Sequence, residues 1–252
     1  MGRIEFRDIH KSFGGNTVLR GVDLQVDAGS VHYIIGQSGA GKSVLVKHLI
    51  GLERPDRGRV FVDGEDVTEL SERELYPLRK RCAMVFQHAT LFDSMSLLDN
   101  VALPIRKHQN VDEERARQLA ARELERVDME EYADRYPADF GDGMRKKVAI
   151  ARALTLDPEF VIFDEPTTGL DPPSADMVDE LIRDLSDDLG VTSIVISHDL
   201  RSTFRVADRI AMLYKGELRL KGTPETFRQT DDTVVRQFIE GSPDGPMEEP
   251  DG

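Results

Sequence analysis

Short apolar runs alternate with amphipathic stretches along most of the chain. The apolar runs are mainly β-branched or aromatic, which predicts strands buried on both faces. They occupy residues 31–35, 82–86, 159–163 and 192–196. The amphipathic stretches at residues 44–50, 71–81 and 174–189 predict helices, and Ser71 with Glu74 forms a capping-box pattern. Strands that alternate with helices predict an α/β fold with a parallel sheet.

The remaining pattern divides the chain into a core, an insertion and a tail. Residues 3–8, 17–26 and 59–64 predict further strands, with a turn at residues 11–15. Over residues 88–156 the pattern of short apolar strands gives way to charged, helical segments. A charged helix over 111–127 and a second helix over 143–156 predict a helical insertion within one core. A hairpin follows at 209–214 and 217–221, then short helices at 224–228 and 233–240. We therefore expect core segments at about 1–87 and 157–222, helices at 223–240, and an acidic, disordered tail at 241–252.

Composition narrows the class of protein. Asp and Glu outnumber Lys and Arg, 47 to 33, for a net charge of −14, which argues against broad contact with a nucleic acid backbone. No apolar stretch approaches the roughly 20 residues that span a bilayer. The single cysteine, Cys82, excludes an internal disulfide and indicates a reducing cytoplasm.

The residues between the first apolar run and the helix after it form a phosphate-binding pattern. They read GQSGAGKS, which matches G-x-x-x-x-G-K-[ST] in the strand–loop–helix context that this motif requires. Glycines let the backbone wrap a phosphate chain, and helix N–H groups face its negative charge. The pattern predicts binding of a nucleoside triphosphate, with Lys42 reaching the β- and γ-phosphates and Ser43 on Mg²⁺. The loop and its neighbour that we expect to contact nucleotide are Gly36, Gln37, Ser38, Gly39, Ala40, Gly41, Lys42, Ser43 and Val44.

Five polar or aromatic positions elsewhere are candidates for the same chemistry. Asp164 and Glu165 end a buried strand, where two carboxylates are costly unless they serve a metal or a proton; Asp164 would hold Mg²⁺ and Glu165 would polarise water. Taken singly, the other three are ambiguous. Phe13 could stack on a base or be a strand-end core residue, Gln87 could bind metal or cap the chain, and His198 could contact the γ-phosphate or be a loop histidine.

In order and spacing, these positions resemble the ATP-binding subunit of ABC transporters over residues 3 to 240. The resemblance implies a P-loop NTPase (RecA-like) core with an N-terminal antiparallel β subdomain and a helical subdomain insertion. It also implies roles: Phe13 as the base-stacking aromatic, Gln87 as the Q-loop glutamine, Asp164 as the Walker B aspartate, Glu165 as the catalytic glutamate, Asp171 in the D-loop and His198 as the switch histidine. All three ambiguous positions fall in register, which favours their functional interpretations.

A narrower resemblance is to the ATPases of MCE-type (Mla-like) lipid transporters. It rests on MVFQ (residues 84–87), ATLFDSM (89–95), DNVA (99–102), Met144, VRQFIEG (235–241) and DGP (244–246). It implies a homodimer on the cytoplasmic face of the inner membrane, a membrane-embedded permease and an MCE-domain protein as partners, and phospholipid or another lipid as cargo.

One segment departs from the family pattern. The signature L-S-G-G-Q or L-S-G-G-M aligns with Phe140 to Met144, so Gly141 replaces the serine, Asp142 replaces the first glycine, and Gly143 is retained. In the family this segment touches the γ-phosphate held by the other subunit. Losing the serine removes a hydrogen bond of about 1.5–3 kcal/mol. A carboxylate at residue 142 adds repulsion against phosphate unless it turns away, is protonated or caps its own helix.

Three rival functions remain open from the sequence. The chain could be an ABC ATPase for another cargo, such as lipoprotein release or cell-division regulation, or a weakly hydrolysing regulatory subunit because of Gly141 and Asp142. A DNA-repair or chromosome-type ABC ATPase is disfavoured by the acidic balance and by the lack of a long coiled-coil insertion.

Overall fold

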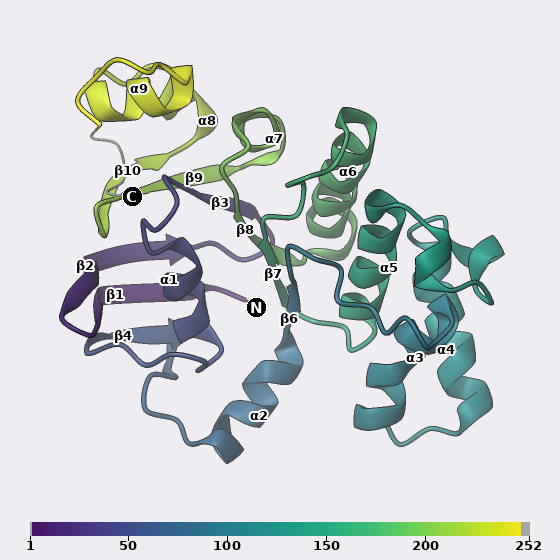
Figure 1. Cartoon of the computed structure of the whole chain (residues 1–252). Coiled ribbons are helices and arrows are strands. Elements are labelled where there is room, and N and C mark those ends of the chain that lie inside the picture. Colours follow the sequence, from purple (N-terminus) through teal and green to yellow (C-terminus); the bar gives the residue numbers. More distant parts are fainter. Residues whose placement is uncertain (1, 248–252) are drawn as a thin grey trace.

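The larger of two sheets is mostly parallel and runs through the middle of the molecule. The computed structural model describes residues 2–247. The sheet has the order β10-β9-β3-β8-β7-β6, parallel except for the antiparallel β9–β10 hairpin at its edge (Figure 1). Its strands are β3 (Val31–Ile35), β6 (Cys82–Val85), β7 (Phe160–Asp164), β8 (Thr192–Ile196), β9 (Arg209–Tyr214) and β10 (Glu217–Gly222). The four buried apolar runs are therefore neighbouring parallel strands, as their pattern predicts.

The smaller sheet is antiparallel, with the order β2-β1-β4-β5. Its strands are β1 (Ile4–Phe13), β2 (Asn16–Val26), β4 (Arg57–Val62) and β5 (Glu65–Asp66). The turn expected at residues 11–15 is narrower than predicted. β1 continues to Phe13 through register shifts in its pairing with β2, and Gly14 and Gly15 alone turn the chain, both at positive φ.

Helices cover both faces of the parallel sheet. α1 (Lys42–Leu49) and α2 (Glu72–Arg81) pack between the two sheets, and α2 begins with the predicted Ser71–Glu74 capping box. α6 (Pro172–Leu189), α7 (Leu200–Val206), α8 (Pro224–Arg228) and α9 (Thr233–Glu240) pack on the other side.

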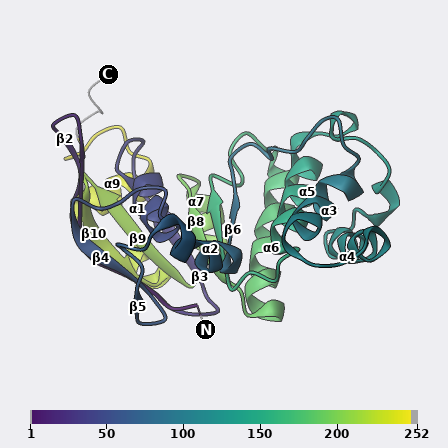
Figure 2. The ribbon, with the colours of Figure 1, turned by 90° about the horizontal axis from the view of Figure 1, so that it is seen from below.

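The helical insertion has an apolar core of its own, built by α3 (Leu97–His108), α4 (Glu113–Glu125) and α5 (Asp142–Leu154), with short 3₁₀ turns at Glu130–Tyr132 and Pro137–Asp139. Turned by 90°, the molecule shows this helical unit standing to one side, with α6 beside it (Figure 2). α5 belongs to both cores: Val148 and Ala151 pack among the insertion helices, whereas Ile150 and Leu154 pack against the parallel sheet. α5 is thus the mechanical link between the two parts.

Two helices were not predicted from the sequence. α3 contains Pro104 in its interior, which argues against a helix, yet Ser96 caps its start and its apolar face is buried. α7 has only seven residues, too few for a clear periodic pattern, and Asp199 caps it. None of the helices within residues 2–247 is long and apolar enough to cross a membrane.

The start of the acidic tail has a defined path. Met247 donates its backbone N–H to Gln237 of α9 at 2.6 Å and packs against the apolar residues on that side of the sheet, so residues 241–247 fold back on α9 rather than extending away. The rest of the segment predicted to be disordered, residues 248–252, lies outside the described residues.

Candidate functional site

A cavity of about 760 Å³ lies at the carboxyl ends of β3, β7 and β8. This edge is where α/β proteins bind ligands, because loops leave the sheet there and helices begin there. The cavity gathers most of the residues singled out from the sequence. Its lining is Phe13, Val18, residues 36–44, Gln87, Asp164, Glu165, His198 and Phe238.

The phosphate-loop conformation requires its glycines. Gly36, Gly39 and Gly41 have φ values of 145°, 77° and 97°, a region that L side chains rarely adopt. A Cβ on Gly36 would stand 2.2 Å from the carbonyl oxygen of Leu213, and one on Gly41 would stand 2.6 Å from Leu19. The loop therefore sits against β9 and β2 so closely that only glycine fits at these two positions.

Lys42 is fixed inside this loop. It is buried, and its ammonium donates to the carbonyl oxygens of Gly36 at 2.8 Å and Gln37 at 2.9 Å. Burial lowers the pKa of Lys42, while the charges of Glu165 and Asp164 oppose that shift. An ammonium held against the backbone of this glycine-rich loop is suited to bind a polyphosphate chain.

Ser43 and Asp164 meet across the floor of the cavity. The Ser43 hydroxyl lies 3.4 Å from Asp164 Oδ1. Burial raises the pKa of Asp164, and the neighbouring Glu165 carboxylate adds to the effect. The Ser43 hydroxyl and the Asp164 carboxyl group are therefore a pair of oxygen ligands suited to Mg²⁺, because a hard cation prefers oxygen ligands.

Glu165 is oriented toward the mouth of the cavity by two partners. Its Oε2 lies 2.9 Å from His198 Nδ1 and accepts from the Thr168 hydroxyl at 2.9 Å. The backbone of Glu165 has φ 50°, unusual for a non-glycine residue, and its N–H donates to Ile196 of β8. A carboxylate held by a histidine at the end of a buried strand is arranged to accept a proton from water.

Three apolar side chains outside the phosphate loop, two of them aromatic, also line the cavity. Phe13 is 43% exposed, so it is not a strand-end core residue, and it lines the cavity at the end of β1. Val18 and Phe238 line the same cavity and were not predicted from the sequence to contact nucleotide. Phe238 follows the helical spacing of α9, so no local signal distinguished it from a residue that only packs.

The altered signature segment does not reach this cavity. Asp142 lines a second cavity of about 360 Å³, beside Lys146 and Gly169, while Gln87 lines both cavities. Gly141, Gly143 and Asp171 line neither. Asp171 caps α6 by accepting from the backbone N–H of Ser174, and Gly143 packs so closely on α6 that a Cβ would stand 2.7 Å from the Ser174 hydroxyl.

The structure also tests whether the Asp142 side chain caps its own helix. Gly141 is the N-cap of α5, and no side chain caps this helix. Asp142 is its first residue; the carboxylate is 78% exposed and lies 3.8 Å from Arg145. The capping interpretation is therefore wrong: this carboxylate faces solvent, where it benefits only from the helix dipole and a loose ion pair.

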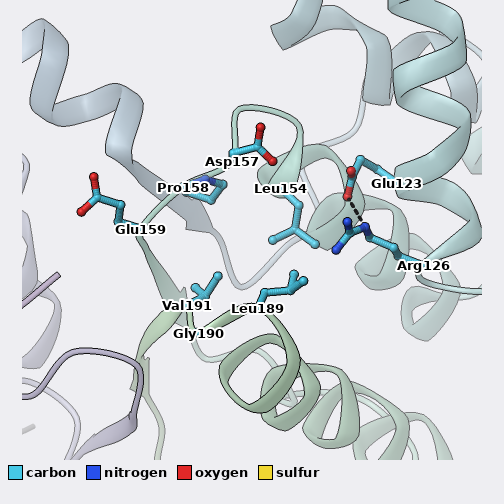
Figure 3. Close-up of a pocket in the computed structure, with 9 residues that line it drawn as sticks. All are labelled: Glu123, Arg126, Leu154, Asp157, Pro158, Glu159, Leu189, Gly190 and Val191. Carbon is cyan, nitrogen blue, oxygen red and sulfur yellow. Dashed lines mark ion pairs between the residues drawn. The ribbon is translucent and has the colours of Figure 1, made fainter. Parts of the chain in front are cut away.

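A third cavity, of about 370 Å³, lies at the opposite edge of the sheet (Figure 3). It is bounded by the C-terminal ends of α4, α5 and α6 and by the residues just before β7 and β8. Its charged lining includes the Glu123–Arg126 ion pair at 3.3 Å, where burial raises the pKa of Glu123. None of the residues proposed for nucleotide chemistry lies here, because this is the amino end of the parallel strands.

Comparison with known sequences identifies relatives along nearly the whole chain. The pattern of the ABC transporter family matches residues 19–168. The intermembrane phospholipid transport ATP-binding protein MlaF of Haemophilus influenzae is 39% identical over 97% of this chain and 92% of its own length. MlaF of Escherichia coli K12 is 34% identical over 97% of this chain and 91% of its own. A probable ribonucleotide transport ATP-binding protein of Mycobacterium leprae is 38% identical over 97% of this chain and 70% of its own.

Solved structures share the fold. A dimeric ATP-binding cassette in a post-hydrolysis state, bound to ADP and Pi, is 28% identical, with a TM-score of 0.79 over 88% of this chain and 98% of its own. A protein from Clostridium perfringens that is part of an ABC transporter complex is 27% identical, with a TM-score of 0.84 over 95% of both chains.

Proposed function

This chain belongs to the ABC transporter family as an ATP-binding subunit, and from that premise we propose that it hydrolyses ATP to energise phospholipid transport between bacterial membranes. The observation that carries the proposal is the convergence of Lys42, Ser43, Asp164, Glu165 and His198 on one cavity, from three separate segments of sequence. A core that only packed would not bring four ionisable groups to a solvent-open site beside a phosphate-binding loop.

The geometry of the cavity supports a role for each of these residues in the proposed reaction. The N–H groups of the loop and the Lys42 ammonium bind the phosphates, and Phe13 stacks on the base. Ser43 and Asp164 would hold Mg²⁺, which supplies positive charge for the phosphate oxygens when bound. Glu165 accepts the proton of the attacking water, and His198 fixes the orientation of that carboxylate through their 2.9 Å contact. Gln87 reaches the same cavity from β6.

A second copy of the chain completes each site. Because the signature segment of this chain lies outside its own phosphate cavity, its residues are available to a nucleotide held by another subunit. The similar cassette is dimeric, which supports a homodimer with two shared sites. Gly141, Asp142, Gly143 and Asp171 would then face the partner's nucleotide, and the exposed carboxylate of Asp142 makes this face less favourable for phosphate.

The cargo is a lipid that a partner permease carries. The names of the MlaF relatives support phospholipid, and this chain accounts for 92% of the length of one of them but only 70% of the mycobacterial relative named for ribonucleotides. We therefore place the subunit on the cytoplasmic face of the inner membrane, bound to a membrane-embedded permease and, through it, to an MCE-domain protein.

The first test is Glu165→Gln in the full chain. This change keeps the shape of the side chain but removes the proton acceptor, so we expect phosphate release from Mg-ATP to fall at least about 100-fold while ATP affinity is retained. Glu180→Gln, an exposed carboxylate on α6, is the control and should hydrolyse like the unaltered chain. Undiminished turnover in the Glu165 variant would remove Glu165 from this role.

The cargo is tested with the subunit assembled on its permease in vesicles. ATP-dependent movement of a fluorescent phospholipid should occur with the unaltered chain and stop with Glu165→Gln. Movement of a radiolabelled ribonucleotide instead of the phospholipid would refute the lipid assignment and leave the ATPase assignment intact.

A further inference from the structure

The loop that joins β6 to α3 connects the nucleotide cavity to the helical unit. Gln87 stands at its start and lines both the nucleotide cavity and the cavity beside Asp142. At the far end of the loop, the buried Asn100 side chain accepts from the N–H of Phe92 and donates to its carbonyl, at 2.7 and 3.0 Å. The loop is therefore attached to the helical unit at one end and reaches the ATP site at the other.

Two cations from α5 hold the first half of this loop. Lys146 Nζ donates to the carbonyl oxygens of Phe86 at 2.9 Å and Gln87 at 2.5 Å. Six residues further along the same helix, Arg152 donates to the carbonyl oxygens of Ala89 at 3.3 Å and Thr90 at 3.0 Å. Four carbonyl groups of five consecutive residues thus accept from one helix, the helix that begins with the signature segment.

Lys146 is an unusual residue for this position. It is only 2% exposed, and the partners of its ammonium are neutral carbonyls. Burial lowers the pKa of Lys146 to about 8, although the charges of Asp142 and Asp164 oppose the shift. Burying an ammonium with no adjacent carboxylate costs free energy, so a residue that served only to fill space would be better replaced by an apolar one.

We propose that Lys146 is a positioning residue for ATP hydrolysis: it ties the backbone of Gln87 to α5, so that the glutamine and the signature segment move as one body. The proposal rests on the ATPase function above. α5 packs in both apolar cores. If the helical unit rotates, the hydrogen bonds of Lys146 would move the loop with α5 and change how far Gln87 enters the nucleotide cavity.

The next residue provides a matched control. Lys147 is also buried, at 8% exposure, on the same helix, but its ammonium lies 3.4 Å from Asp128 in the helical unit and does not contact the loop. Replacing either lysine with methionine removes one ammonium from α5 and leaves a side chain of similar length. Only the Lys146 change releases the carbonyls of Phe86 and Gln87.

The experiment compares Lys146→Met, Lys146→Arg and Lys147→Met in the full chain. We expect Lys146→Met to lower kcat for ATP about tenfold with KM changed less than about twofold, because the loop positions a group used in turnover and does not build the phosphate site. Lys146→Arg, which keeps the donors and the charge, should recover most of the rate. Amide hydrogen exchange in residues 86–92 should be faster in Lys146→Met than in Lys147→Met. If the methionine variant does not fold, Lys146→Gln takes its place.

Equal kcat values for the two methionine variants would overturn the proposal. So would a loss of kcat in Lys146→Met without faster exchange in residues 86–92, since the residue would then act elsewhere. Failure of the unaltered chain to hydrolyse ATP would count against the proposed function instead, and the exchange comparison would still decide whether Lys146 holds the loop.

Discussion

The two half-sites of this molecule are built in opposite ways. The phosphate loop is shaped by its own chain: Gly36 lies against β9, and Lys42 is buried with both of its carbonyl partners in place. The signature segment is open: a Cβ added to Gly141 would have no neighbour within 4 Å, and the Asp142 carboxylate is 78% exposed. In the proposed homodimer, nucleotide binding would therefore be determined within one chain, whereas the rate of turnover would depend on an exposed face that meets the second chain.

The two halves are joined behind the site by a buried carboxyl group. Asp179 of α6, the helix on which Gly143 packs, accepts from Ser202 of α7, the helix that follows His198, at 2.8 Å. Asp199 accepts from the backbone N–H of Ser202, at 3.2 Å. The two halves are thus connected through packed helices and a buried hydrogen bond, independently of any bound nucleotide.

The largest expected effect comes from a substitution in the phosphate loop. Gly36→Ala places a Cβ 2.2 Å from the Leu213 carbonyl at a φ of 145°, so we expect a loss of more than about 3 kcal/mol in the free energy of unfolding, together with loss of ATP binding. Gly39→Ala is the control, because a Cβ there meets no atom and only the positive φ, worth about 1–2 kcal/mol, opposes it. Denaturant unfolding and equilibrium nucleotide binding measure both. Equal effects would mean that close packing on β9 does not shape the loop.

The next effect concerns the link between the halves. Burial raises the pKa of Asp179 to about 6, with Asp199 and Asp176 adding to the shift and Arg205 opposing it. The folded state therefore holds a proton that the unfolded state has lost, so this group's contribution to stability is full below about pH 4 and is lost as the pH rises through about 6. The loss amounts to about 2–3 kcal/mol.

Asp179→Asn tests this expectation, since the amide keeps the shape and the hydrogen bond without ionising. The variant should gain stability relative to the unaltered chain above pH 6, and the difference should shrink toward pH 4. Urea unfolding at a series of pH values measures it. Parallel pH profiles for the two proteins would refute the assignment of this titration to Asp179.

The smallest expected effect comes from substitutions in the signature segment. A serine fits at residue 141, and the double change Gly141→Ser with Asp142→Gly restores the family pattern. We expect kcat to rise about tenfold, because a hydroxyl donor to phosphate is regained and a carboxylate is removed. Asp142→Asn alone separates the charge from the missing hydroxyl. An unchanged rate would show that the altered segment does not limit turnover and would exclude a regulatory role based on weak hydrolysis.

Much of the fold was predictable because its signals are local. The five-residue apolar runs identified the parallel strands, and Ser71 with Glu74 marked the start of α2. α3 was not predicted, although Ser96 caps its start. Like Pro77 in α2, Pro104 does not end the helix, because the apolar face of α3 is buried against α4 and α5. The path of residues 241–247 could not be predicted from their own sequence, because contacts with Gln237 and with an apolar surface of the folded chain determine it.

The sequence by itself determined which groups we propose for the chemistry: the GQSGAGKS loop, Asp164 with Glu165, and His198 each lie at the end of a strand that the hydrophobic pattern predicts. Only the tertiary structure decided how they act together. In the structure, His198 contacts Glu165, and the ammonium of Lys146 donates to the carbonyl oxygens of Phe86 and Gln87. The Asp142 carboxylate is exposed to solvent and does not cap α5. The reason is physical: residue type fixes charge and hydrogen-bonding capacity, but which groups lose their water and find each other depends on contacts between segments far apart in the chain.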